Sequence, residues 1–469
     1  MAFAPLLFLS IGCNKLKDFG GTNINPGAAT NPSPGGLFAN ITGGLAGYAY
    51  SQTPAYYCQY FSETQYSSVS LYSLVQSSAT GMYSGSAFDC VTLQNMSQST
   101  NNQKLAARVA KDFMIWVSTD GLGDIPYSEA MLGIENISPA YDKQEDIYKG
   151  LINDLTEISD SFDGSLIFGD VTTFGGDPAS WRRLTNSLRL LMALRLSNVY
   201  PGASDYAATQ FKAALADAGG VIESNSQNLG TTYPGGSYKD PLYNLYDGRK
   251  DVAESKTMTD LLGAISDARQ NVYGGVNTSN APSTVGVPYG ITRDKATAFT
   301  DANPDWAYVL RKDLRSATST YHIVTAAEVL LARAEAADRG WTNEDVNMMY
   351  EKGIAASFNQ RGLPNPTNSY LTQSSVVLGA TGTGGNLKQI ATQRYLASYP
   401  DGNQGWAEWR RTGYPELTPA LDAVNASKLI PRRYAYSPAE YNSNGTNVKA
   451  AVSRLQGGDT QDSRVWWDQ

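Results

Sequence analysis

Histidine is almost absent from this sequence. The 469 residues contain a single one, His322. A Ser-His-Asp triad or a Cys-His pair would have to use that residue, and a zinc site with several histidine ligands cannot be built. His322 opens the helical pattern 322–339, where a packing or capping role suits it better than catalysis. The scarcity of histidine does not exclude a hydrolase whose catalytic residues are only Asp and Glu.

Clustered positive charge and long apolar runs are also missing. The net charge is −8, and no run of Lys and Arg is long enough to follow a phosphate backbone, which argues against nucleic-acid binding. Beyond the N-terminus, no window approaches the roughly 20 apolar residues of a spanning helix. The glycine-rich GTGG at 382–385 lacks the GK(S/T) ending of a phosphate loop, and no cofactor is predicted.

The N-terminal stretch MAFAPLLFLSIGC indicates an export signal. Its apolar run ends in small residues before Cys13, which predicts a signal peptide over 1–12 and a lipidated Cys13. The run is short and no Lys or Arg precedes it, as if the true start lay upstream. The alternative is an apolar segment with an incidental cysteine. Residues 13–40, rich in Gly, Asn, Pro and Thr, predict a flexible tether.

Only two cysteines remain after Cys13. In an oxidising compartment Cys58 and Cys90 could form a disulfide, whose closed loop would contribute about 3 kcal/mol. Two separately buried thiols are the alternative.

Helical periodicity dominates the chain. Asp177 before Pro178 is typical of a helix start, and Asn343 is expected to cap the second helix of a hairpin closed by Gly340–Thr342. Helices are predicted at 103–117, 142–159, 177–199, 205–217, 322–339 and 343–360.

Long irregular segments separate these helices. The segments 224–248, 271–305 and 364–386 are rich in Gly, Asn, Ser and Thr, and loops of this length usually carry function. The fold class predicted is mainly α, with a tetratricopeptide-like helical hairpin scaffold, long irregular loops and little β.

Several stretches in this order resemble one family, the SusD/RagB outer-membrane nutrient-binding lipoproteins, in the SusD-like branch of the Bacteroidetes type. They are DGLGDIPYSEA (120–130), YDKQEDIYKGLINDL (141–155), WRRLTNSLRLLMALRLSNV (181–199), AEVLLARAEAADRGW (327–341), YEKGIAASFNQRG (350–362), TQRYLASYPDGNQGWAEWRRTGYPEL (392–417) and IPRRYAYSPAEYNSNGTNVKAAV (430–452).

This resemblance implies a binding protein of the cell outer membrane rather than an enzyme. It would be lipid-anchored through Cys13 and would capture oligosaccharides, or in some members peptides, for a SusC-like TonB-dependent transporter. It also implies one SusD-like domain over 41–469. The helical scaffold would cover about 41–225 and 318–362, and the loop-rich ligand side about 226–317 and 363–469.

The stretch GWAEWRRTGYPEL (405–417) is expected to form a packed corner. Trp406 and Trp409 share a helical face, and Arg410 and Arg411 can stack on rings or pair with carboxylates. A ligand platform is the alternative interpretation.

Ligand-stacking aromatics are expected in the polar loops instead. Each could be a buried loop anchor, but segments as polar as 56–85 and 287–310 are not expected to bury every ring. The predicted ligand-binding residues are Tyr66, Tyr72, Tyr83, Tyr289 and Trp306.

Two other functions compete with glycan capture. An α-helical glycoside hydrolase would need one Asp/Glu pair, which no motif marks. A tetratricopeptide scaffold for protein segments would need a regular array, which the sequence does not show.

Overall fold

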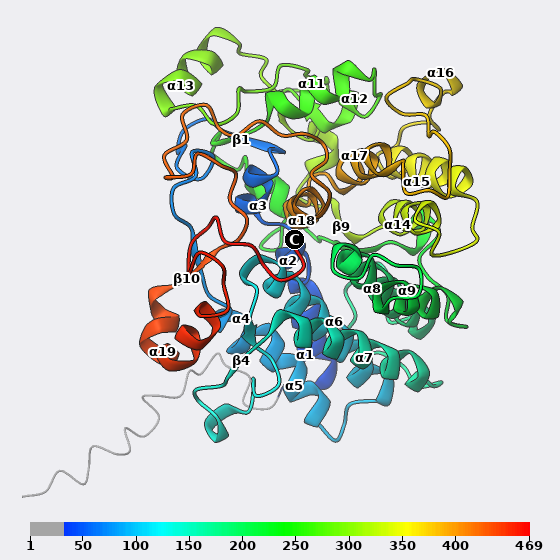
Figure 1. Ribbon diagram of the computed structural model, residues 1–469. Helices are drawn as coiled ribbons and strands as arrows, with labels where there is room; N and C mark the ends of the chain where they lie inside the picture. Colours follow the sequence, from blue (N-terminus) through cyan, green and yellow to red (C-terminus); the bar gives the residue numbers. More distant parts are fainter. Residues whose placement is uncertain (1–31) are drawn as a thin grey trace, which may run out of the picture.

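The protein is mainly helical, as predicted. The computed structural model describes residues 32–469, so the expected signal peptide, Cys13 and most of the tether lie outside the described residues. The helices are α1 (Pro34–Gly44), α2 (Ala46–Ala49), α3 (Gln52–Tyr57), α4 (Thr80–Tyr83), α5 (Ser86–Asn95), α6 (Asn101–Leu122), α7 (Gln144–Ser161), α8 (Pro178–Arg195), α9 (Tyr206–Ala216), α10 (Pro241–Asn244), α11 (Lys256–Ala264), α12 (Gln270–Tyr273), α13 (Arg293–Ala302), α14 (Ala326–Asp338), α15 (Val346–Gln360), α16 (Asn368–Leu371), α17 (Leu387–Ser398), α18 (Gly402–Thr412) and α19 (Pro438–Val452) (Figure 1).

The β-structure consists of small two-stranded sheets that join segments far apart in sequence. The antiparallel pairs are β1 (Phe61–Glu63) with β6 (Val252–Glu254), β3 (Ile125–Pro126) with β4 (Tyr141–Asp142), β5 (Leu229–Thr232) with β9 (Thr320–Val324), and β7 (Gly274–Gly275) with β8 (Tyr308–Val309). One pair is parallel, β2 (Gln76–Ser77) with β10 (Ala435–Tyr436).

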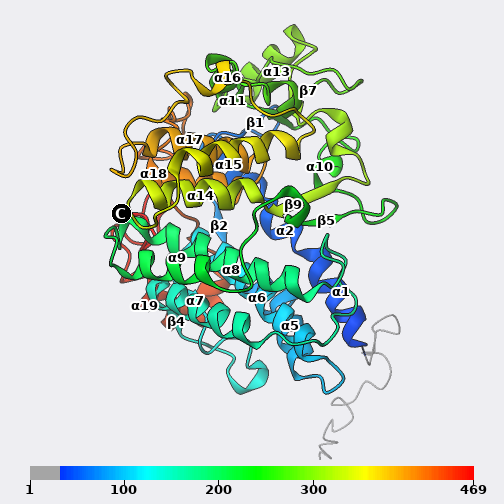
Figure 2. The same cartoon turned by 90° about the vertical axis from the view of Figure 1, so that its right-hand side faces the viewer.

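Neighbouring helices pack as hairpins. The pairs α5–α6, α7–α8, α8–α9 and α14–α15 are in contact, and Figure 2 shows α14 and α15 lying above α8 and α9. The α14–α15 hairpin is the predicted tetratricopeptide-like unit. Gly353 permits its close approach, because a Cβ there would lie 2.6 Å from Leu331 Cγ. One hydrophobic cluster extends from Phe38 to Trp467.

Side-chain caps set several helix starts. Asp177 accepts hydrogen bonds from the backbone of Ala179 and Ser180, and Pro178 is the first residue of α8, as predicted. Thr325 and Glu328 form a capping box that starts α14.

The predicted helix start at His322 is wrong. His322 belongs to β9, where it pairs with Gly230, and the helix begins only after Thr325. Burial, with the nearby Arg361 charge, lowers the pKa of His322 to about 4. A neutral imidazole packed in a strand is consistent with the packing role, rather than a catalytic one, expected for this residue.

Three other predicted boundaries, two helix starts and the end of the tether, also differ from the structure. Asp142 lies in β4 and accepts from the backbone of Tyr127 and Ser128, so α7 starts at Gln144. Asp345, not Asn343, caps α15. The predicted tether end at 40 is too late, because α1 starts at Pro34 and buries Phe38.

The corner at 405–417 is packed and ion-paired, which confirms the prediction. The Arg410 guanidinium stacks 3.7 Å from the centroid of the buried Trp406 ring. Its Nη1 donates to the carbonyls of Asp120 and Arg432 at 2.7 and 2.9 Å. Trp409 is half-buried, with Arg432 at 4.8 Å from its ring centroid.

Arg411 forms the central ion pair of the scaffold. Its Nη1 and Nη2 each lie 2.6 Å from a carboxylate oxygen of Glu335 on α14, and Nη2 lies 2.7 Å from Glu408. Arg394 on α17 lies 2.9 Å from Glu408. Burial alone would raise the pKa of Glu335, but Arg411 and Arg339 hold it well below its usual range. The network ties α14, α17 and α18 together.

The two described cysteines are not paired. Cys58 and Cys90 are free, buried thiols, so the structure agrees with the alternative of two separate thiols and not with a disulfide. Burial raises the pKa of both thiols, which leaves little reactive thiolate.

Within residues 32–469, none of the helices combines the length and the apolar character needed to cross a bilayer.

Replacing Arg411 by Met should lower the free energy of unfolding by about 3–5 kcal/mol, because Glu335 and Glu408 would keep buried charges without this partner. Urea denaturation followed by tryptophan fluorescence measures the change. Lys256→Ala is the control, since it breaks the exposed Lys256–Asp260 pair and should cost less than about 1 kcal/mol. Equal effects of the two variants would contradict the central role of Arg411.

Candidate functional site

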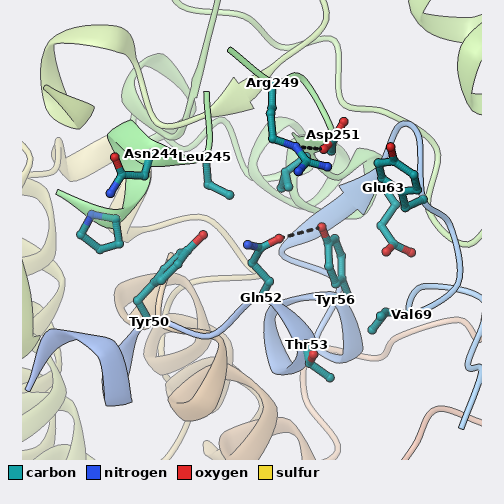
Figure 3. A pocket seen from close by; sticks show the side chains of 13 residues that line it. Tyr50, Gln52, Thr53, Tyr56, Glu63, Val69, Asn244, Leu245, Arg249 and Asp251 are labelled. Atoms are coloured by element: carbon teal, nitrogen blue, oxygen red, sulfur yellow. Dashed lines mark hydrogen bonds and ion pairs between the residues drawn. The ribbon is translucent and has the colours of Figure 1, made fainter. Parts of the chain in front are cut away.

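A cleft of about 590 Å³ opens beside the N-terminal loops. Figure 3 shows one side formed around α3 and the opposite side formed around Asn244 and Leu245. Its size suits a small-molecule or oligosaccharide ligand. The lining residues are Tyr50, Gln52, Thr53, Tyr56, Glu63, Tyr66, Val69, Pro241, Asn244, Leu245, Arg249, Asp251 and Val252. We call it the Tyr66 cleft.

Backbone pairing fixes the two walls of the Tyr66 cleft. β1 pairs with β6 so that Glu63 faces Val252, and the Thr64 amide donates to the Asp251 carbonyl at 2.9 Å. On the far wall, Asp240 caps α10 by accepting from the Leu242 and Tyr243 amides. The cleft thus combines a segment of the expected scaffold with one of the expected ligand-side loops.

Tyr66 is the exposed aromatic of the cleft. Its side chain is 61% exposed, and the Arg249 guanidinium lies 5.6 Å from the ring centroid. Arg249 is itself held by Asp251, with Nε 2.5 Å from Oδ2. The ion pair supports the ring from one side and leaves an aromatic surface open to solvent.

Uncharged polar groups line the floor. Gln52 lies between the Tyr50 and Tyr56 rings, and the Tyr56 hydroxyl donates to its Oε1 at 3.4 Å (Figure 3). The Tyr50 hydroxyl is buried without a hydrogen-bond partner among the described residues. Gln52 and Asn244 are exposed, so their amides are available to a ligand.

Glu63 closes one end of the cleft and is 7% exposed. Burial raises the pKa of Glu63 to about 7, although its Oε2 accepts from the Ser70 amide and hydroxyl, both at 2.7 Å. Near neutral pH this carboxyl is therefore only partly ionised.

Of the five predicted ligand-binding residues, the structure places Tyr66 alone in this cleft. Tyr83 is half-buried beside a second cleft of about 510 Å³, with its hydroxyl bonded to the Pro126 carbonyl. Tyr72 is fully buried, its hydroxyl accepts from the Ala420 amide, and its ring packs near Tyr289.

Trp306 is 5% exposed and stacks on Tyr308 at a centroid distance of 3.9 Å. The Tyr289 hydroxyl is also buried. Tyr72 and Trp306 thus pack their rings against protein neighbours, and Tyr289 is partly buried. These loops bury more aromatic surface than their polar composition suggests, because distant segments cover them.

The sequence reasoning missed Gln52, Asn244 and Arg249. The one available signal was the long irregular segment 224–248, which includes Asn244 and Leu245 of the far wall and stops just before Arg249. No local pattern indicated which of its residues face a ligand.

No metal centre is found in the part of the chain that the structure describes, since no three His, Cys, Asp or Glu side chains gather there.

Comparison with models of known protein families matches the chain to one family. The SusD-like family model, described as "Starch-binding associating with outer membrane", matches residues 26–437. A search of curated proteins found no match.

Several solved structures have the same fold as this chain. A chitin-binding SusD homologue from Flavobacterium johnsoniae superposes with a TM-score of 0.80 at 24% identity, over 93% of this chain and 98% of that chain. A structure described as a chitin-binding protein has a TM-score of 0.77 at 27% identity, over 93% and 100% of the two chains. A SusD homologue from Bacteroides uniformis has a TM-score of 0.77 at 24% identity, over 92% and 99%.

Proposed function

Because the chain belongs to the SusD-like family of starch-binding proteins that associate with the outer membrane, we propose that its Tyr66 cleft captures oligosaccharides at the cell surface. The observation that carries this proposal is the exposed Tyr66 ring, held by the Arg249–Asp251 pair at the mouth of a polar cleft. Two of the similar structures are described as chitin-binding, so chitin oligosaccharides are the first ligands to try.

The chemistry of the cleft suits a sugar. The apolar C–H face of a pyranose ring stacks on an aromatic ring, and its hydroxyls exchange hydrogen bonds with amides and phenols. Tyr66 supplies the ring, and Gln52 and Asn244 supply neutral donors and acceptors around it.

Delivery to a transporter is the second part of the proposal. Cys13 would carry the lipid that holds the protein at the outer membrane, and a SusC-like TonB-dependent transporter would receive the captured oligosaccharide. The support for this part is the apolar stretch ending in SIGC, together with the family's association with the outer membrane. Ser33, the α1 cap, stands 20 positions after Cys13, a separation along the chain of at most about 70 Å.

Tyr66→Ala should weaken oligosaccharide binding by about 1–3 kcal/mol, because one stacking ring is removed. Calorimetry with chitohexaose, cellohexaose and maltohexaose measures the affinity. Tyr238→Ala is the matched control, since Tyr238 is 74% exposed and does not line the cleft.

If Tyr66→Ala binds the preferred sugar like the folded wild type, the cleft is not the capture site. Release of shorter oligosaccharides during the incubation would instead favour a helical glycoside hydrolase.

Cys13→Ala, expressed with a complete signal peptide, should move the protein from the membrane to the soluble fraction. Without the substitution, gentle detergent extraction should recover the protein with a TonB-dependent barrel, identified by mass spectrometry. Retention of the Cys13→Ala protein in the outer membrane would refute the anchor. Purification always as a single chain, with the barrel expressed, would refute the partner.

A further inference from the structure

The charges around the Tyr66 cleft restrict the sugars it can accept. Glu63, Arg249 and Asp251 are the charged side chains that line it within residues 32–469. The single cation among them therefore faces two carboxyl groups. This inference rests on the proposed glycan-binding function and concerns the charge of the ligand.

The positive charge of Arg249 is partly neutralised by Asp251. Its Nε lies 2.5 Å from Asp251 Oδ2, and its guanidinium covers the Tyr66 ring. Binding of a carboxylate or a sulfate normally takes an arginine fork or a free ammonium group. An anionic sugar that approached the Arg249 guanidinium would therefore also lie close to the Asp251 carboxylate, whose charge opposes it.

Among the charged groups just outside the lining, Arg293 donates to Gln65 Oε1 at 3.3 Å, and its side chain does not line the cleft. Lys239 is paired with Asp247, at 2.8 Å. The Asp240 carboxyl caps α10 and adds negative charge behind the far wall. Lys250 is exposed and next in sequence to Arg249, but its side chain does not line the cleft. The remaining polar contacts come from the neutral Gln52 and Asn244.

We propose that the Tyr66 cleft selects uncharged saccharides and discriminates against sugars that carry carboxylate or sulfate groups. Discrimination arises because an anion that approached Arg249 would also meet the Asp251 carboxylate, and like charges at an interface oppose binding strongly. A neutral hexose needs only ring stacking and neutral hydrogen bonds, which the cleft offers.

The test uses pairs of ligands that differ only in charge. Chitohexaose, cellohexaose and maltohexaose are each compared with the same oligosaccharide oxidised at C6 to the uronate. Calorimetry at moderate ionic strength gives both affinities. We expect the best-bound neutral oligosaccharide to lose at least about tenfold in affinity on oxidation.

Asp251→Asn tests the cause of this discrimination. The substitution removes one carboxylate and frees Arg249 to pair with the ligand, so the oxidised oligosaccharide should bind about tenfold tighter than it does to wild type. Asp260→Asn is the matched control. It makes the same change in the exposed Lys256–Asp260 pair, whose Nζ–Oδ2 distance is 2.6 Å, outside the cleft, and should leave the neutral-to-oxidised ratio unchanged.

Three outcomes distinguish the selection of uncharged saccharides from the proposed glycan capture itself. A large neutral preference that shrinks in Asp251→Asn and persists in Asp260→Asn supports the inference. Equal or tighter wild-type binding of an oxidised oligosaccharide overturns the inference while glycan capture stands. Absence of binding to the neutral and the oxidised oligosaccharides alike overturns glycan capture and the inference with it.

Discussion

The buried pairing of Glu335 with Arg411 is the interaction on which the rest of the structure depends. Desolvating these charges costs several kcal/mol per ion, so the pair is favourable only because both guanidinium nitrogens meet both carboxylate oxygens at 2.6 Å. That geometry is available in one arrangement of α14 against α18. The pair therefore fixes the position of α18, and the surrounding contacts follow from that position.

The consequences extend from α18 to the cleft. Gly402 lies directly against α3, since a Cβ there would be 2.2 Å from the Ala55 nitrogen, and Gly405 leaves room for the Tyr60 ring. α3 contributes Gln52 and Tyr56 to the floor of the Tyr66 cleft. The corner at 405–417 is thus structural in itself, but it positions one wall of the candidate site. A rigid wall of this kind lowers the entropy cost of binding.

Helical regions were predictable from the sequence because their signals are local. Apolar periodicity located α6, α7, α8 and α9 within a few residues, and the Asp177 cap set the start of α8. His322 was misassigned because its strand pairing involves Gly230, about ninety positions away, which no local pattern reveals. The same limit applies to the cleft, where Gln52 and Arg249 are brought together by the β1–β6 pairing.

The tyrosines show this limit most clearly. The sequence has 29 of them, which suits wet binding surfaces and core edges equally. In the structure many fill the core and satisfy their hydroxyls on backbone carbonyls, as Tyr273 does on Leu396 at 2.7 Å and Tyr395 on Cys58 at 2.6 Å. Tyr66 differs because Arg249 supports its ring while distant segments leave it uncovered.

The most direct test of this account is a crystal structure of the protein with the neutral hexasaccharide that binds most tightly. The account predicts a sugar ring stacked on Tyr66, with its hydroxyls within hydrogen-bond distance of Gln52 and Asn244. A sugar bound instead in the cleft of about 330 Å³ beside Trp409, with the Tyr66 cleft empty, would contradict it.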